Sequence, residues 1–244
     1  MSALEITETG EHVEVRLNRP EKRNAIDQTM VDELHAVCAD LERRPRPMLL
    51  TGGDDGVFAA GADIAQLRDR TSADALRAIN AGIFDRMRRL PLPTVAAIDG
   101  PALGGGAELA YACDIRICTT RAFFGQPEAR LGIIAGAGAT WRLPRLVGES
   151  LAKELLFTGR RMLAEEALSA RLVSSVVEPG ELLDAARAMI ARIAKASPMA
   201  LRLTKLAVDA PEGAHPQVEL AAQAFLFDDD EKHRRMTEFL TKKS

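Results

Sequence analysis

Hydrophobic residues recur along the chain in two spacings, one typical of strands and one typical of helices. Polar and apolar residues alternate over 12–17, which predicts a half-buried strand. Continuous apolar runs predict further, buried strands at 48–51, 94–98, 114–118 and 173–177. Apolar residues three or four apart predict a helix over 27–41 and a second over 72–90. The second helix would place Leu76, Ile79, Ile83, Met87 and Leu90 on one face.

Strands and helices alternate over the first two thirds of the chain, and helices dominate after Thr140. The later helical runs cover 181–196, 198–209, 215–227 and 230–243. This order predicts an α/β core followed by a helical C-terminal region. We expect the core over 1–190 and the helical region over 191–244, with no low-complexity linker between them.

Composition narrows the class of protein further. A chain of 244 residues with 47% hydrophobic and 4% aromatic residues can bury one large core filled by aliphatic side chains. The net charge of −3 gives no reason to expect nucleic-acid binding. No signal region begins the chain, no run reaches membrane-spanning length, and the three cysteines lack metal-ligand spacing. We therefore expect a cytoplasmic protein with reduced, buried thiols, no membrane contact and no metal site.

The most informative local stretch is 98–110, which reads as the end of a strand, three glycines and the start of a helix. The glycine N–H groups would lie unpaired at a helix N-terminus, where they favour negative charge. Glu108 would lie in the first turn of that helix. The alternative is a plain tight turn in which Glu108 only complements the helix dipole.

Three loops leave apolar strands and carry glycine or acidic residues, at 58–64, 99–108 and 124–138. Loops at the carboxyl ends of neighbouring strands line the ligand crevice of an α/β sheet. The first two loops offer backbone N–H groups that would form an oxyanion hole together. The second and third each offer a glutamate, Glu108 and Glu128, as an acid/base pair.

Other sites for catalysis receive little support. The stretch 136–141 lacks the third glycine of a dinucleotide fingerprint, no Walker-type lysine follows a glycine loop, and no serine occupies a G-x-S-x-G elbow. The four histidines are scattered along the chain, and we expect them to be exposed and not catalytic: His12, His35, His215 and His233.

The glycine and acidic motifs together resemble a known family. Ala60-Gly61-Ala62-Asp63-Ile64, Asp99-Gly100-Pro101-Ala102-Leu103-Gly104-Gly105-Gly106-Ala107-Glu108-Leu109 and Phe124-Gly125-Gln126-Pro127-Glu128 are followed by Leu131-Gly132-Ile133 and Gly136-Ala137-Gly138. In order and spacing they resemble the crotonase family, the enoyl-CoA hydratase/isomerase superfamily, from about residue 4 to the end of the chain.

The resemblance implies repeated ββα units that form a spiral core, with a C-terminal helical region for trimerisation and for covering the CoA site. It implies homotrimers or dimers of trimers and an acyl-CoA thioester substrate, with no cofactor beyond the coenzyme A that the substrate carries. The N–H groups of Ala62 and Gly105 would hold the thioester oxygen. The CoA site would be lined by these residues: Arg23, Asn24, Ala25, Ala60, Ala62, Asp63, Ile64, Ala65 and Gly105.

Within the superfamily, glutamates at both 108 and 128 resemble the hydratases of fatty-acid or related acyl-CoA breakdown. The resemblance implies that Glu108 takes a proton from water and that Glu128, as the neutral acid, supplies a proton to carbon 2. Two close carboxyls resist double ionisation, which suits this division of roles. The alternatives are a double-bond isomerase or acyl-CoA hydrolase on the same frame, or an acyl-CoA binder without catalysis.

Some residues depart from the family pattern. Trp141 stands where hydratases often have a polar residue, and it would either pack or alter the acyl pocket. Arg234 and Arg235 replace an acidic-glycine pair in the last helix. Lys242 and Lys243 are expected to be solvated, and the alternative is that they meet the phosphates of CoA. The helix over 72–90 and the loop before it would border the acyl pocket.

Overall fold

The computed structural model describes residues 2–53 and 56–241 and contains two β-sheets covered by helices. The strands are β1 (Leu4–Glu8), β2 (Val13–Leu17), β3 (Met48–Thr51), β4 (Thr94–Ile98), β5 (Pro101–Leu103), β6 (Ile115–Thr119), β7 (Phe123–Gly125), β8 (Met162–Leu163) and β9 (Ser175–Val177). The α-helices are α1 (Gln28–Arg43), α2 (Ile64–Asp69), α3 (Ser72–Leu76), α4 (Ile79–Arg88), α5 (Gly105–Ala112), α6 (Ala139–Val147), α7 (Glu149–Thr158), α8 (Ala164–Ser169), α9 (Leu182–Ala194), α10 (Pro198–Val208), α11 (Gln217–Phe227) and α12 (Asp230–Thr241).

The larger sheet has the strand order β1-β2-β3-β4-β6-β9. Only the β1–β2 pair is antiparallel, and the remaining neighbours run parallel. The smaller sheet, β5-β7-β8, begins immediately after β4 and stands over the ends of the larger one. Because the parallel strands end at one edge, the loops that follow β3, β4 and β6 lie near one another.

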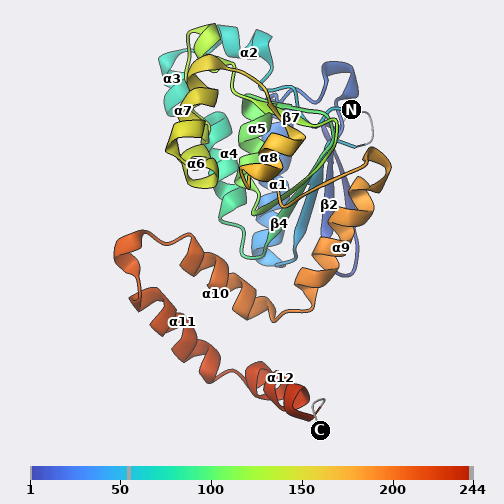
Figure 1. Ribbon diagram of the computed structural model, residues 1–244, viewed down its shortest axis with the longest axis vertical. Helices are drawn as coiled ribbons and strands as arrows, with labels where there is room; N and C mark the ends of the chain where they lie inside the picture. Colours follow the sequence, from blue (N-terminus) through green and yellow to red (C-terminus); the bar gives the residue numbers. More distant parts are fainter. Residues whose placement is uncertain (1, 54–55, 242–244) are drawn as a thin grey trace.

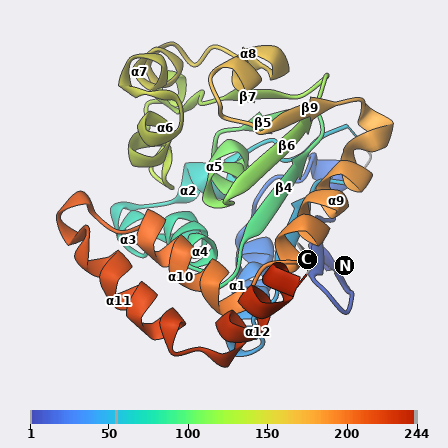
Figure 2. The ribbon, with the colours of Figure 1, turned by 60° about the horizontal axis from the view of Figure 1, so that its bottom comes forward.

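The central strands are buried on both faces, as their continuous apolar runs predict. In β3 and β4, Leu49 and Val95 pack on one face against Leu182 and Ile190 of α9. Their neighbours in sequence face the other way, because successive side chains of a strand alternate between the two faces. Those neighbours, such as Leu50, join the main core with α1, α4 and α5. Figures 1 and 2 show α9 alone against one face of this sheet.

Helix α1 shows how the local sequence sets one element. Its buried residues Met30, Leu34, Val37 and Leu41 follow the predicted helical spacing. The side chain of Asp27 accepts a hydrogen bond from the N–H of Met30 at 2.9 Å and caps the first turn.

The predicted helix over 72–90 is wrong in one respect, because two helices, α3 and α4, occupy this range. Ala78 between them adopts a left-handed conformation with φ of 53°, which turns the chain and changes the helical phase. Leu76 is consequently 87% exposed, whereas Ile83 and Met87 of α4 are buried. The break places the start of α4 beside the glycine stretch.

Two other expectations need correction. The segment after β6 was expected to be a loop, but Phe123–Gly125 form β7, which pairs in parallel with β5. His12 is not exposed, because the residue is 8% accessible and its ring hydrogen-bonds Thr9 and Glu14. His35 is half-buried beside Arg86, and His215 and His233 are exposed as predicted.

The last three helices extend away from the sheets as an arm, which Figure 1 shows in orange and red. Two ion pairs bind α10 to the body: Lys205 to Asp114 at 2.7 Å and Arg88 to Asp209 at 2.9 Å. Arg235 of α12 donates to the carbonyl of Lys195, so the last helix of the arm contacts the residues that precede the first. Lys242 and Lys243 lie outside the described residues.

Candidate active site

A cavity of about 600 Å³ opens between α2–α4 and the loops that carry the glycine and acidic motifs. Four of the predicted site residues line it: Ala62, Gly105, Glu108 and Glu128. Apolar residues, among them Leu67, Ile79, Ile133 and Ile134, cover much of the remaining wall. Residues between Leu67 and Ala81 supply one side of the cavity.

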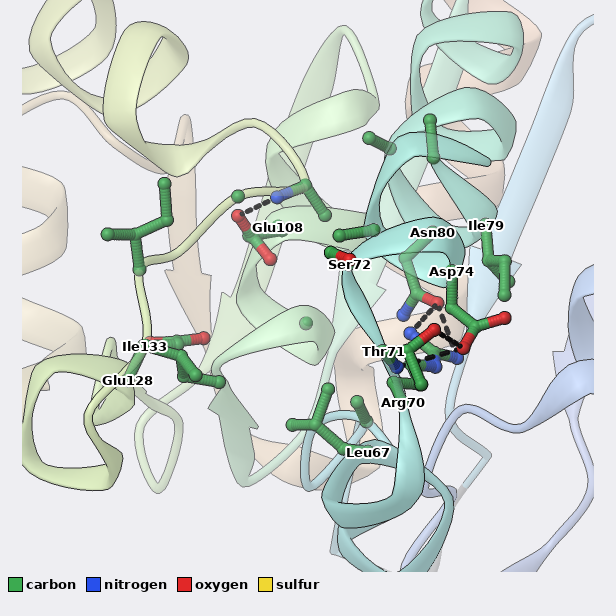
Figure 3. Close-up of a pocket in the computed structure, with 18 residues that line it drawn as sticks. Leu67, Arg70, Thr71, Ser72, Asp74, Ile79, Asn80, Glu108, Glu128 and Ile133 are labelled. Carbon is green, nitrogen blue, oxygen red and sulfur yellow. Dashed lines mark hydrogen bonds between the residues drawn. The ribbon is translucent and has the colours of Figure 1, made fainter.

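Glu108 lies in the first turn of α5, as predicted from the glycine stretch, and is 4% exposed. Its Oε1 accepts hydrogen bonds from the N–H groups of Ala137 at 2.8 Å and Ala139 at 3.0 Å. Burial raises the pKa of Glu108 to about 7, the charge of Glu128 adds to the rise, and hydrogen bonds from the backbone at 137–139 oppose it. Figure 3 shows its second oxygen pointing into the cavity.

Glu128 begins the 3₁₀ turn Glu128–Leu131 at the foot of the same cavity and is 9% exposed. Burial raises its pKa above the ordinary value of a glutamate. Gln126, with its amide nitrogen turned toward Glu128, donates to the two carboxyl oxygens at 3.2 and 3.0 Å. Tyr111, which is also buried, hydrogen-bonds the side chain of Gln126.

The three glycines before Glu108 differ in what an added Cβ would meet. Gly104 has φ of 50°, and a Cβ there would lie 2.7 Å from Oε1 of Glu128. A Cβ on Gly106 would lie 2.2 Å from the carbonyl oxygen of Ala59, so α5 could not approach the backbone at Ala59 as closely. A Cβ on Gly105 would meet only the N of Ala62 at 3.4 Å and other atoms further away.

The N–H groups of Ala62 and Gly105 therefore flank one small volume at the cavity wall. Neither donates a backbone hydrogen bond within residues 2–53 and 56–241. Gly105 is the first residue of α5, so the N-terminal end of a helix dipole points at the same place. Unpaired N–H groups in this setting favour negative charge on an oxygen placed between them.

The other predicted CoA-site residues lie on two adjacent segments outside the cavity lining. The N–H of Ala60 donates to the carbonyl of Arg23 at 3.0 Å, and the N–H of Asp63 donates to that of Ile26 at 3.0 Å. Asn24, in the turn between Arg23 and Ala25, donates to three carbonyls, of Gly52, Val57 and Phe58. Asp63 caps α2 through the N–H of Ala65, and Ile64 is 60% exposed.

Residues that depart from the family pattern lie away from the cavity. Trp141 is absent from the cavity lining within the described chain, and its ring contacts the guanidinium groups of Arg88, Arg142 and Arg145. Arg235 pairs with Glu231 in α12. Both departures are accounted for by packing and by ion pairs.

Several site residues carried no signal in the sequence. Asn80 and Arg70 line the cavity, but a helical pattern does not distinguish a polar residue facing a cavity from one facing solvent. The FGQPE motif contains Gln126, yet only the structure shows its contact with Glu128. The described residues contain no group of three or more His, Cys, Asp or Glu that could hold a metal ion.

The three cysteines are free and buried, as expected. No helix in the described part of the chain is long and apolar enough to cross a membrane.

Comparisons with known proteins give a consistent result. A family model described as enoyl-CoA hydratase/isomerase matches residues 8–244. The chain is 37% identical to the short-chain-enoyl-CoA hydratase of Clostridium acetobutylicum over 94% of this chain and 91% of the relative. It is 39% identical to the crotonyl-CoA hydratase of Syntrophomonas wolfei, over 93% of this chain and 90% of the relative.

Solved structures agree with this match. An enoyl-CoA hydratase from Bacillus anthracis superposes with a TM-score of 0.93 at 33% identity, covering 98% of this chain and 96% of that chain. The structural match confirms the fold class that the sequence motifs imply.

Proposed function

The chain belongs to the enoyl-CoA hydratase/isomerase family, and we propose that it is an enoyl-CoA hydratase. It adds water across the double bond of a 2-trans-enoyl-CoA and releases a 3-hydroxyacyl-CoA. The observation that carries the proposal is the pair of buried carboxyls, Glu108 and Glu128, that line one cavity with the unpaired N–H groups of Ala62 and Gly105. The names of the relatives from Clostridium acetobutylicum and Syntrophomonas wolfei support the same reaction.

The thioester oxygen lies between the N–H groups of Ala62 and Gly105 in this proposal. When water attacks carbon 3, the electron pair of the double bond moves toward the thioester and the oxygen becomes an enolate oxygen. Two fixed donors stabilise that charge more than they stabilise the ground-state carbonyl, so they accelerate the chemical step. One such donor contributes roughly 3–4 kcal/mol in comparable sites.

Glu108 acts as the base that removes a proton from the attacking water. Two backbone N–H groups hold its Oε1, which leaves Oε2 to accept a hydrogen bond from water in the cavity. A pKa of about 7 keeps a large share of this carboxyl ionised at neutral pH and makes it a stronger base than an ordinary glutamate.

Glu128 acts as the acid that protonates carbon 2 of the enolate. Its raised pKa favours the neutral form that can give up a proton. Ionised Glu108 raises the proton affinity of its partner, since two nearby negative charges repel each other. After each turnover, the proton that Glu108 took from water passes to Glu128, which restores the ionised base and the neutral acid.

The turn at 23–25 and the segment 60–65 bind the CoA portion of the substrate in this proposal, and no further cofactor takes part. The hydrogen bonds between the two segments support it, because they hold the turn beside Ala62. The buried free thiols are consistent with the reducing cytoplasm that we propose as its location.

We also propose that the chain assembles as a homotrimer or a dimer of trimers. The arm exposes large apolar side chains to solvent: Leu220, Phe225, Phe227 and Met236, each more than half exposed. A monomer rarely leaves so many on one segment. Light scattering after gel filtration tests this proposal, which predicts a mass of three or six chains, and a single-chain mass would contradict it.

The reaction is tested with purified protein and 2-trans-enoyl-CoAs of four to sixteen carbons, with the products identified by mass spectrometry. We expect a 3-hydroxyacyl-CoA from at least one chain length and its loss in both Glu108→Gln and Glu128→Gln. An isomerase that relies on Glu128 alone would survive Glu108→Gln. Binding of every thioester without turnover would indicate an acyl-CoA binder and refute the hydratase.

A further inference from the structure

Asn80 is a buried polar residue on the wall that faces the two glutamates. It is the second residue of α4 and is 8% exposed. Its Oδ1 accepts hydrogen bonds from both terminal nitrogens of Arg70, each at 3.3 Å. Figure 3 shows the carboxyls of Glu108 and Glu128 on one side of the cavity and the Asn80–Arg70 contact on the other.

The contact with Arg70 fixes which way the amide of Asn80 points. A guanidinium only donates hydrogen bonds, so the oxygen of the amide must face it and Nδ2 must face away. Nδ2 lies 3.7 Å from the position that a Cβ on Gly105 would take. Within residues 2–53 and 56–241 it donates no hydrogen bond to the protein. Nδ2 is not sealed off inside the protein, because it borders the cavity, where it can donate to water or to a bound ligand.

Three donors meet at the same place. The position that a Cβ on Gly105 would take is 3.4 Å from the N of Ala62 and 3.7 Å from Nδ2 of Asn80. The N–H of Gly105 itself is next to this position. We propose that Asn80 is a catalytic residue whose Nδ2 donates a third hydrogen bond to the thioester oxygen, and that Arg70 is its positioning residue. This inference rests on the placement of that oxygen in the proposed function.

Arg70 contributes in two ways. Its hydrogen bonds hold the amide in one orientation and polarise it, which strengthens the bond that Nδ2 donates. Arg70 also makes no ion pair within 4.0 Å in the part of the chain described, although its charge acts on nearby Asp74, which accepts hydrogen bonds from Thr71 and Arg77. The half-buried positive charge therefore adds to the field that favours an enolate.

The first experiment measures the polarisation of the thioester without any turnover. Butanoyl-CoA has no double bond to hydrate, and a ¹³C label at its thioester carbonyl isolates the C=O stretch in infrared difference spectra. We expect the bound band to lie below that of free butanoyl-CoA in the wild-type protein. In Asn80→Leu the band should return part of the way to the free value. A merely structural role for Asn80 would leave the band of bound ligand unchanged.

The second experiment compares kcat with KM for the enoyl-CoA that the wild type turns over best. Loss of one donor to the oxygen should lower kcat of Asn80→Leu roughly 10²-fold with a much smaller change in KM. Asn80→Asp keeps the shape and an acceptor for Arg70 but removes the donor, so its kcat should fall at least as far. This second variant keeps the test usable if the leucine variant does not fold.

Arg70 is tested through its effect on the same band. Arg70→Met should lower kcat about tenfold and move the carbonyl band toward the free value, because the amide is no longer fixed. Arg70→Lys retains one donor to Oδ1 and should recover part of both effects. Arg68→Met is the matched control, since Arg68 lies two residues earlier, in α2, is exposed and pairs with Asp69.

The outcomes separate this inference from the proposed function. A folded Asn80→Leu with the wild-type carbonyl band and wild-type kcat would overturn the role of Asn80. If the wild type binds butanoyl-CoA and the band shifts in Asn80→Leu, but no enoyl-CoA is hydrated, the donor role stands and the hydratase fails. A wild type that binds no acyl-CoA would overturn both.

Discussion

Gly105→Ala should abolish most of the activity while leaving the fold intact. The added Cβ would lie 3.4 Å from the N of Ala62 and 3.7 Å from Nδ2 of Asn80, which are ordinary contact distances. Gly105 is also the first residue of α5 and has no positive φ. Alanine there should therefore keep the free energy of unfolding or raise it by up to about 1 kcal/mol, since alanine favours the helix.

The same methyl group would occupy the volume that we assign to the thioester oxygen. Displacing that oxygen from one donor costs roughly 3–4 kcal/mol in comparable sites. At about 1.4 kcal/mol for each factor of ten, kcat/KM should fall about 10²- to 10³-fold.

Gly106→Ala is the matched control, because its Cβ would lie 2.2 Å from the carbonyl oxygen of Ala59. This overlap with backbone requires a shift of α5, so we expect roughly 1–3 kcal/mol of destabilisation. Thermal unfolding followed by circular dichroism, together with hydration of a four-carbon 2-trans-enoyl-CoA, measures both variants. Near wild-type kcat/KM in Gly105→Ala, or a lower melting temperature than that of Gly106→Ala, would refute the steric reasoning.

Two further predictions concern stability. The pKa of Glu108 rises from 4.5 to about 7 on folding, so the free energy of unfolding should fall as pH rises through this window, by about 3 kcal/mol in all. Glu108→Gln keeps an oxygen that accepts from the N–H groups of Ala137 and Ala139 but cannot ionise. Urea unfolding should therefore show that this variant is more stable than the wild type at pH 8 and equally stable near pH 4.5. Parallel pH profiles of the two proteins would contradict this. Arg116 is buried and donates to the carbonyls of Leu172 at 2.6 Å and Cys113 at 2.6 Å, among others, so Arg116→Met should cost about 3 kcal/mol or more in the same assay. A loss below 1 kcal/mol would mean that water replaces Arg116 at these carbonyls.

Local pattern was enough to predict the parts of the fold that depend on neighbours in sequence. The spacing of Met30, Leu34, Val37 and Leu41 predicted α1, and Asp27 predicted its start. The run at 94–98 predicted β4, and the glycines after it predicted the start of a helix with Glu108 in the first turn. In each case the residues that decide the structure lie within a few positions of one another.

The features that the sequence pattern did not predict depend on contacts between distant segments. The break at Ala78 has no glycine or proline to mark it, and it follows from the packing of α4 on α1 and α5. Strands β5 and β7 have three residues each, too few to show a periodicity. The amide of Asn80 is oriented by Arg70, ten residues earlier and on the other side of that break. No pattern in one sequence encodes such a contact.

One incubation in ¹⁸O-labelled water tests the central claim most directly. Purified protein would be mixed with a four-carbon 2-trans-enoyl-CoA and the products would be analysed by mass spectrometry. Hydration at the Glu108–Glu128 site predicts one ¹⁸O in the 3-hydroxyl group of an intact acyl-CoA, and no such product in Glu108→Gln. Label in a free carboxylic acid, an unlabelled isomerised enoyl-CoA, or unchanged substrate would contradict it.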